Sequence, residues 1–367
     1  IRINLNLIKN FILFCFSLLI SFFLAEFLVI SFSPQDLSGT WRVPSVDRTY
    51  MLNKSYGSAR HQFQRRVVNY SFGEYHTRLY TKKINCEKKI LVLGDSFTFG
   101  WLLKEKDTFI FKLQNHIENR KRKRCFLNAA TAAWGLSDYL AYTQDFIQKI
   151  KPDVVLVFLN LDDISRIFRR KTFKLDNGKI QRNLVKSNRV TLKEIVNSIP
   201  LYNWLLERSH IINLLRKIMI AGYNNHKYTL KKSANTFTIS HGTSMPSKRD
   251  SELAVKFAEK IFTSIKIYAS REESKLFVIT TGWQGLTAKS DNSKNPNIKF
   301  FKNAKNFFKN LKVPYIDSSK KLRSLKGNIP IHNFLIPMDG HPNKRGAELI
   351  YRSSVNEILN LLQKYSL

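Results

Sequence analysis

From Lys88 onward the chain alternates between short apolar runs and longer amphipathic stretches. The short runs have the length and β-branched content of buried strands, and the longer stretches repeat apolar residues with a helical period. Strands are expected at Ile90–Leu93, Cys125–Ala130, Val154–Asn160, Leu276–Thr280 and Val313–Ile316. Helices are expected at Asp107–Asn119, Ser137–Ile150, Ser251–Ala269, Asn297–Leu311 and Lys344–Lys364. This alternation predicts a parallel sheet covered by helices on both faces, a three-layer α/β/α sandwich.

The first 34 residues differ in kind. Phe11–Phe32 is almost wholly apolar, interrupted only by three serines and Glu26. A helix of about 22 residues is about 33 Å long, enough to cross a bilayer core. A cleavable signal peptide is the alternative, but its apolar core is usually shorter, and no small-x-small cleavage site follows here. We therefore favour an uncleaved transmembrane signal anchor. Arg2 and Lys9 flank its amino end, so the positive-inside rule predicts a cytoplasmic amino end and a main domain outside the cytoplasmic membrane.

The rest of the chain divides into a lead-in and a main domain. Gln35–Glu87 is an irregular lead-in with short strands expected at Gln62–Tyr70 and His76–Thr81. Residues 88–367 form the main domain, whose alternation is interrupted by an insertion at about 164–250.

The insertion begins with a predicted hairpin at Phe173–Ile180, in which Asn177-Gly178 supplies the positive φ angles of a tight turn. Leu201–Tyr223 is then predicted to be one long apolar-rich helix. This helix either packs on the domain, or it forms a cap over a site or a surface facing the membrane. Asn224–Arg249 is predicted to be a linker.

The net charge of +34 at pH 7 raises the question of nucleic-acid binding. Its best local support is the basic run 120–124. That run follows a predicted helix, however, where cations favour the carboxyl end of the helix dipole. The other lysines are spread over the whole chain. The sequence therefore argues against nucleic acid as a partner and favours anionic lipid head groups or acidic polysaccharide.

The three cysteines give no indication of a metal site. Cys15 lies in the apolar segment, and Cys86 and Cys125 stand alone. The chain has neither a Cys-x-x-Cys pair nor a His-Glu-x-x-His motif, so no metal and no cofactor are expected.

Ser96 is the best candidate for a reactive residue. It follows a predicted buried strand in Gly-Asp-Ser, at the carboxyl edge where open α/β sheets bind ligands. A serine hydroxyl is a weak nucleophile and needs a base. The best base is His341 in Asp-Gly-His-Pro-Asn, with Asp339 placed to hold its second ring nitrogen. His332 is the fallback base, and Asp317 the fallback carboxylate.

These two segments resemble the first and last sequence blocks of the SGNH (GDSL-type) hydrolase family, in a membrane-anchored form. The resemblance implies a flavodoxin-like parallel sheet, the SGNH-hydrolase fold, and a catalytic triad of Ser96, His341 and Asp339. Many family members space the last pair as Asp-x-x-His, whereas this chain has Asp-x-His. Anchored members often carry a stretch like residues 35–87, which we interpret as a stalk.

The resemblance also implies an oxyanion hole with three donors. They are the Ser96 backbone N–H, a glycine N–H and an asparagine amide. Ala133 stands at the glycine position and supplies its N–H only if the loop avoids a positive φ; Gly135 is the substitute. Direct alignment puts Asp162 at the asparagine position, with Asn160 as the rival donor. An ionised carboxylate only accepts hydrogen bonds, so this alignment predicts that Asp162→Asn raises the rate by roughly 10- to 100-fold.

A disulfide is a further consequence of the flavodoxin-like order. In that order the first two strands are neighbours, which puts Cys86 and Cys125 about 5 Å apart near the amino edge of the sheet. That separation suits a bridge, and an extracytoplasmic domain lets it form. Two reduced thiols are the alternative.

Together these features predict a membrane-anchored serine esterase that cleaves an O-acyl ester on a cell-envelope glycan or lipid. One alternative is an O-acyltransferase that uses the same triad to acylate a polysaccharide, supplied by a membrane-bound acyl-donor partner. Another is a catalytically impaired protein that binds glycan.

Overall fold

The computed structural model describes residues 5–39, 41–79, 86–118, 124–168, 172–176, 179–183, 199–219, 248–283, 286 and 296–366. The chain divides into two compact units. The smaller one comprises Ile1–Thr40, Ala59–Val68 and Arg189–Gly242. The larger one comprises Trp41–Ser58, Asn69–Asn188 and Thr243–Leu367.

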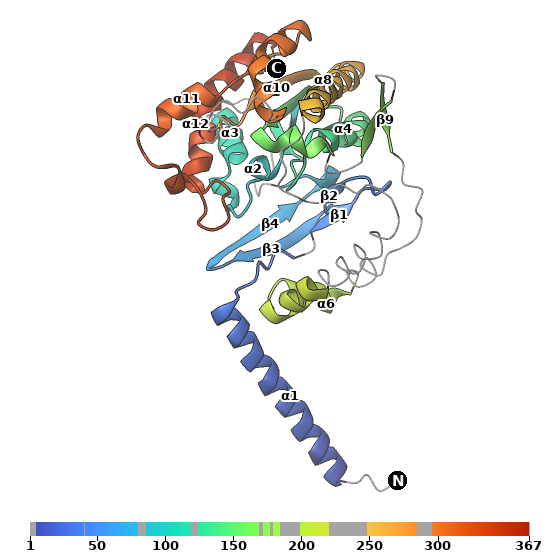
Figure 1. Cartoon of the computed structure of the whole chain (residues 1–367), viewed down its shortest axis with the longest axis vertical. Helices are drawn as coiled ribbons and strands as arrows, with labels where there is room; N and C mark the ends of the chain where they lie inside the picture. The colour runs from blue at the N-terminus through green and yellow to red at the C-terminus, as the bar shows by residue number, and fades with distance from the viewer. Residues whose placement is uncertain are drawn as a thin grey trace. The chain divides into compact units, whose positions relative to one another are not determined.

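The larger unit is built on a parallel sheet of five strands (Figure 1). The strands are β5 (Lys88–Leu93), β6 (Arg124–Asn128), β7 (Val154–Leu159), β10 (Lys275–Thr280) and β11 (Tyr315–Ile316). Their spatial order is β11-β10-β7-β5-β6, which is the flavodoxin-like order 2-1-3-4-5. All six residues of β7 are buried, as the continuous apolar run of a central parallel strand requires. The predicted fold class is confirmed.

Helices cover both faces of this sheet (Figure 1). Alternate residues of β7 point to opposite faces. Val155 and Val157 lie in one core cluster with α4 (Leu136–Ile150), α8 (Lys248–Arg271) and α10 (Pro296–Asn310). Leu156 and Phe158 lie in a second cluster, which they share with three helices from the other face. These are α3 (Phe109–Glu118), α11 (Ser319–Lys326) and α12 (Lys344–Lys364).

The lead-in departs from its prediction. Gln62–Tyr70 is not one strand, because β3 (Gly57–Phe63) and β4 (Arg66–Phe72) form a two-stranded sheet with a turn between them. Gln64 takes φ = 52° in this turn, and no glycine or asparagine in the sequence signals it. Of the strand expected at His76–Thr81, His76 ends the 3₁₀ helix η1 (Glu74–His76), Arg78 forms isolated antiparallel bridges, and residues 80–81 lie outside the described residues. Two further short strands, β1 (Arg42–Pro44) and β2 (Met51–Asn53), pair antiparallel.

The insertion agrees with its prediction in the hairpin and differs in the helix. β8 (Phe173–Asp176) and β9 (Lys179–Arg182) pair antiparallel; their turn lies outside the described residues. The expected single helix from Leu201 is broken into α6 (Pro200–Leu206) and a helix at 210–219. Ser209 begins the second helix, because its hydroxyl accepts the N–H of Ile212 as a local helix cap. Of the predicted linker, residues 224–247 lie outside the described residues, and 248–249 belong to α8.

Two features of the chain's first half bear on its location. α1 (Leu5–Phe32) contains Ile8–Phe32, which is long and apolar enough to cross a membrane. Cys86 and Cys125 form a disulfide with a Cα–Cα distance of 5.5 Å, which decides between the bridge and the two reduced thiols that the sequence left open. The bridge ties the segment before β5 to β6.

Candidate active site

Ser96 lies just beyond the carboxyl end of β5, as the first residue of the short helix α2 (Ser96–Phe99). Asp95 caps this helix by accepting the N–H of Phe97 at 2.9 Å. Gly94 allows the tight turn, because a Cβ there would stand only 2.3 Å from Oγ1 of Thr98. The Gly-Asp-Ser sequence therefore fixes the position of the serine through its own neighbours.

His341 is held in the loop that leads into α12. Its carbonyl accepts the N–H of Ile336 at 2.7 Å, and Gly340 makes the preceding turn with φ = 84°. Asn343 caps α12 by accepting the N–H groups of Arg345 and Gly346. The Asp-Gly-His-Pro-Asn sequence thus makes both the turn and the cap.

The structure brings Ser96, His341 and Asp339 into one chain of hydrogen bonds, which we call the relay. Oγ of Ser96 is 2.8 Å from Nε2 of His341, a residue 245 positions away. Nδ1 of His341 is 2.7 Å from Oδ1 of Asp339. Trp101 donates its indole N–H to Oδ2 of the same carboxylate at 3.2 Å. Each atom of the relay thus has the partner that proton transfer from the serine requires.

The surroundings keep Asp339 charged and the imidazole in place. Burial raises the pKa of Asp339, but hydrogen bonds from the ring and backbone N–H of His341 and from Trp101 outweigh it and lower the pKa below its usual 3.8. The rings of Phe97 and Trp101 lie 5.7 Å and 5.5 Å from the imidazole centroid. Trp101 was not predicted from the sequence, although it stands five residues after Ser96.

The two fallback residues lie elsewhere. Asp317 accepts hydrogen bonds from Thr280 and Ser319 at the start of α11. His332 is exposed on the 3₁₀ helix η5 (Ile331–Phe334). Neither takes part in the relay.

The loop after β6 runs beside the serine. Thr131 donates its N–H to the carbonyl of Gly94 at 3.3 Å. Ala133 takes φ = 65°, so the loop does not avoid a positive φ. Its N–H nevertheless has no hydrogen-bond partner in the described part of the chain, so the positive φ does not make it unavailable, contrary to the expectation. The turn is closed by the N–H of Trp134, which donates to the carbonyl of Thr131, and the alanine takes the left-handed conformation that this turn needs. Gly135 is no substitute donor, because its N–H is bonded to Asp138 in the cap of α4.

The end of β7 distinguishes Asn160 from Asp162. Asn160 is the first residue after the strand and is 5% exposed. Its amide donates to Oδ2 of Asp95 at 3.0 Å and accepts from Thr281 at 3.1 Å. The following 3₁₀ helix, η3 (Leu161–Asp163), turns Asp162 outward, and its side chain is 60% exposed. The side chain of Asn160 therefore lies beside Asp95 at the end of β7, whereas that of Asp162 faces away from it.

A buried charge cluster supports this end of the site. Arg166 donates to Asp95 at 2.9 Å and to the carbonyl of Trp134 at 3.0 Å, and it lies 3.4 Å from Asp163. Burial and the negative charge of Asp95 raise the pKa of Asp163, and Arg166 opposes this shift. Arg166 links the loops after β5, β6 and β7, a role that no pattern in the sequence signals.

Arg78 supports the loop after α2 in a similar way. Its guanidinium is buried and donates to the carbonyls of Phe99, Gly100 and Leu103. These bonds hold the loop that carries Trp101.

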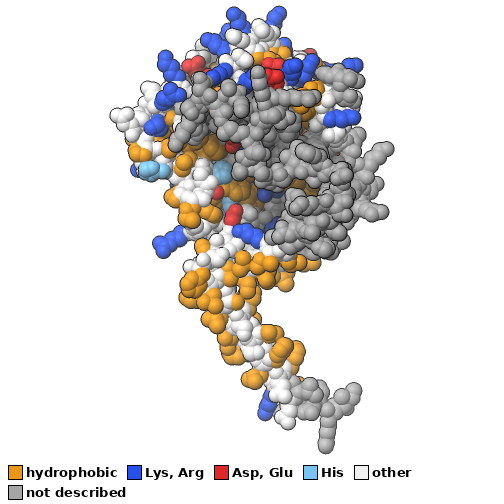
Figure 2. All heavy atoms as spheres, viewed as in Figure 1, with side chains coloured by type: hydrophobic (Ala, Val, Ile, Leu, Met, Phe, Trp, Pro, Cys, Tyr) orange, Lys and Arg blue, Asp and Glu red, His pale blue; other side chains and the backbone are white. Residues whose placement is uncertain are grey.

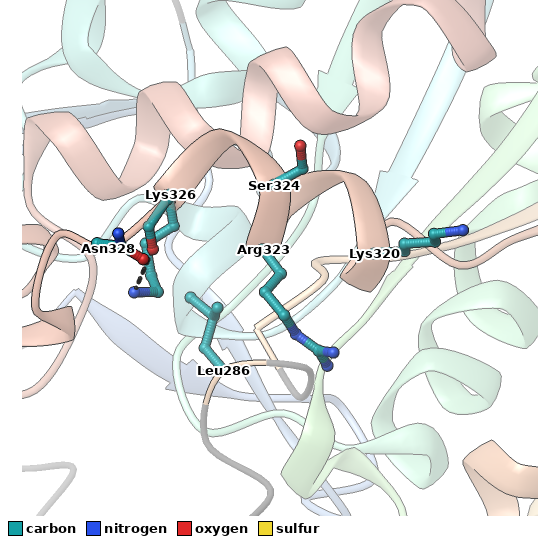
Figure 3. A pocket seen from close by; sticks show the side chains of 7 residues that line it. Leu286, Lys320, Arg323, Ser324, Lys326 and Asn328 are labelled. Carbon is teal, nitrogen blue, oxygen red and sulfur yellow. Dashed lines mark hydrogen bonds between the residues drawn. The ribbon is translucent and has the colours of Figure 1, made fainter.

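A separate hollow of about 600 Å³ lies along α11 (Figure 3). Its lining comprises Leu286, Lys320, Arg323, Ser324, Lys326, Gly327 and Asn328. None of these residues belongs to the relay. Among the described residues, no group of three histidine, cysteine, aspartate or glutamate side chains is placed to hold a metal ion.

No protein-family model and no curated protein matches this chain. Among solved structures it is similar to the psychrotrophic esterase EstA of Pseudoalteromonas sp., with a TM-score of 0.43 and 11% identity over 76% of this chain and 100% of that one. A catalytic mutant of Axe2, an acetylxylan esterase from Geobacillus stearothermophilus, gives a TM-score of 0.43 and 11% identity over 76% and 96%. A lipolytic protein of the G-D-S-L family from Veillonella parvula gives 0.39 and 11% over 73% and 97%.

Proposed function

We propose that this chain is a membrane-anchored serine esterase of the SGNH type, which cleaves an O-acyl ester on a cell-envelope glycan or lipid. The observation that carries the proposal is the relay. Its two contacts, 2.8 Å from Ser96 to His341 and 2.7 Å from His341 to Asp339, lie at the carboxyl edge of a parallel sheet.

In the proposed mechanism, Ser96 is the nucleophile and His341 the general base. Nε2 of His341 takes the hydroxyl proton as Oγ of Ser96 bonds to the ester carbonyl carbon. The imidazolium then gives this proton to the leaving alkoxide, the alcohol departs, and an acyl-serine remains. Water attacks the acyl-serine, its proton passes through His341 to Ser96, and the acid is released. Asp339 stabilises the imidazolium in both halves of the reaction.

The oxyanion that forms in each half needs donors that are already in place. We assign this role to the N–H groups of Ser96 and Ala133 and to the amide of Asn160. Within the described part of the chain, the two backbone N–H groups have no hydrogen-bond partner. Asn160 uses one amide hydrogen on Asp95, and its second remains for the substrate.

The proposed location rests on three features. The apolar span of α1 suits a membrane anchor, and Arg2 and Lys9 at its amino end favour a cytoplasmic start. The Cys86–Cys125 disulfide is typical of an oxidising compartment. The net charge of +34 suits acidic envelope polymers and anionic lipid.

The test is labelling of the detergent-solubilised full chain with a fluorophosphonate probe, paired with hydrolysis of p-nitrophenyl acetate. Ser96→Ala should abolish both signals. Ser324→Ala, which removes an exposed hydroxyl on α11, should change neither. Labelling that persists in Ser96→Ala would refute the assignment. An acyltransferase would use a sugar hydroxyl in place of water, and only in the second step. Such an enzyme would be labelled by the probe but would not hydrolyse the ester, and an acceptor glycan would restore the release of p-nitrophenol.

A further inference from the structure

Glu26 is the one acidic residue in α1, and the smaller unit gives it three donors. Its carboxylate accepts from the hydroxyl of Ser209 at 2.8 Å and from the N–H groups of His210 and Ile211 at 2.6 Å and 2.9 Å. These N–H groups begin the helix at 210–219, where a negative charge stabilises the helix dipole. Glu26 is therefore a helix cap supplied by a different helix.

Further contacts hold the same helix against the chain that leaves α1. The N–H of Gln35 donates to Nδ1 of His210 at 2.8 Å. Nζ of Lys217 donates to the side-chain oxygen of Gln35 at 2.7 Å. The helix at 210–219 is thus bonded to Glu26 of α1 at its start and, near both of its ends, to Gln35 in the segment just after α1.

The position of Glu26 along α1 sets the height of this arrangement. Glu26 lies about 26 Å farther along the helix than Lys9, and a hydrocarbon core is about 30 Å thick. With Lys9 at the cytoplasmic face, Glu26 comes within about 4 Å of the outer boundary of the hydrocarbon. The helix that it caps therefore begins at the level of the lipid head groups.

Apolar side chains are exposed on both helices of this region. Ile199, Leu201 and Trp204 on or beside α6, and Leu215, Ile218 and Met219 on the helix at 210–219, are between 48% and 74% exposed. Residues 215, 218 and 219 have the i, i+3, i+4 spacing of a single helix face. Figure 2 shows hydrophobic side chains along α1 and beside its upper end.

Basic residues accompany these apolar side chains. The guanidinium of Arg208 lies 4.9 Å from the ring centre of Trp204. Arg216 and Lys217 stand between Leu215 and Ile218 in the sequence of the second helix. Tryptophan with arginine suits the head-group layer, where the ring meets lipid and the cation meets phosphate. A helix with one apolar face and basic flanks is the type that lies in a membrane surface.

We propose that α6 and the helix at 210–219, together called the platform, lie in the lipid–water interface of the outer leaflet. The occupant of their exposed apolar face is bilayer lipid, continuous with the lipid around α1. The inference rests on the proposal that α1 spans the membrane. The platform fixes the height at which the smaller unit meets the membrane, through Glu26.

Trp204 provides the test. The full chain is reconstituted into phosphatidylcholine–phosphatidylglycerol vesicles that contain lipids brominated near the glycerol end of the acyl chains. The difference between wild type and Trp204→Phe gives the emission of Trp204 alone. The bromolipid should quench most of this emission and little of that from the other four tryptophans, which are not exposed. Ile218→Asp should reduce the quenching of Trp204. Ile329→Asp, at a similarly exposed isoleucine of the larger unit, should not.

A carbonate wash of the same vesicles separates the two proposals. Protein extracted by carbonate would overturn the anchor and the platform together. Protein that resists carbonate but keeps Trp204 emission unquenched would leave the anchor standing and overturn the platform. Cross-linking of Trp204→Cys to a second copy in such unquenched vesicles would show that protein, and not lipid, covers the face.

Discussion

The two halves of the candidate site are built in different ways. The relay half comes from two short segments in which the neighbours of each reactive residue also fix its position: Asp95 caps the helix of Ser96, and Gly340 makes the turn before His341. The other half holds the residues that we propose to bind the oxyanion, Ala133 and Asn160; we call it the oxyanion half, and it comes from the ends of β6 and β7. There Ala133 and Asn160 depend on residues from distant parts of the chain. Local motifs thus specify one half, and tertiary contacts specify the other.

This difference extends to energetics. The relay half satisfies its charges with nearby donors, and the pKa of Asp339 is lowered. The oxyanion half depends on two buried carboxylates, Asp163 and the same Asp95 that caps the helix of Ser96, which face one partly buried arginine, Arg166. Removing one member of such a buried set typically costs about 3–5 kcal/mol. We infer that substitutions in the relay half lower the catalytic rate more than the stability of the fold. Substitutions around Arg166 should lower the stability more than the rate.

The largest effect should come from the relay itself. His341→Ala removes the general base and should lower kcat/KM for p-nitrophenyl acetate by roughly 10²- to 10⁴-fold, with an unchanged melting temperature. His332→Ala is the matched control, because His332 lies in the neighbouring η5 but outside the relay. If His332→Ala proved the inactive variant, the assignment of the base would be wrong.

The next effect tests the oxyanion half. Asn160→Ala should lower kcat by roughly 10²- to 10³-fold, the usual loss for one oxyanion donor. Asp162→Asn should leave kcat nearly unchanged, because the Asp162 side chain is exposed and points to Arg166. This replaces the gain in rate that the alignment alone predicts. Both variants are measured on one activated ester. A higher kcat in Asp162→Asn together with an active Asn160→Ala would support the alignment that puts Asp162 at the asparagine position.

The sequence predicted what depends on short-range patterns. The five sheet strands and five long helices follow from periodicity, and Ser96, His341 and Asp339 follow from their local motifs. The end of β7 was predicted to within one residue, but the 3₁₀ helix η3 that follows it was not, and this turn is what separates Asn160 from Asp162. Arg166 and Arg78 were missed because their partners are mostly backbone carbonyls and carboxylates brought together only by the fold.

The disulfide connects the two halves at the opposite edge of the sheet, since Cys86 precedes β5 and Cys125 lies in β6. Replacing both with serine should lower the free energy of unfolding by about 2–4 kcal/mol, because the reduced chain has more freedom when unfolded. Urea unfolding of the chain in detergent measures this. Cys15→Ser serves as the control and should change nothing. Equal stability of the double variant and wild type would mean that β5 and β6 are held together without the bridge.

The smallest effect concerns the strain stored in the oxyanion half. Ala133 has φ = 65°, and a left-handed conformation costs a residue with a Cβ about 1–2 kcal/mol. Ala133→Gly removes that cost but gives the unfolded chain about 0.4–1 kcal/mol more entropy, so a net gain of roughly 0.5–1 kcal/mol is expected. The N–H of residue 133 remains, so the ester rate should stay nearly constant. Ala132→Gly is the matched control: it lies one residue earlier without a positive φ and should lose stability. Urea unfolding measures whether the free energy of unfolding rises or falls. A loss of stability in both variants would mean that the left-handed conformation of Ala133 is not strained.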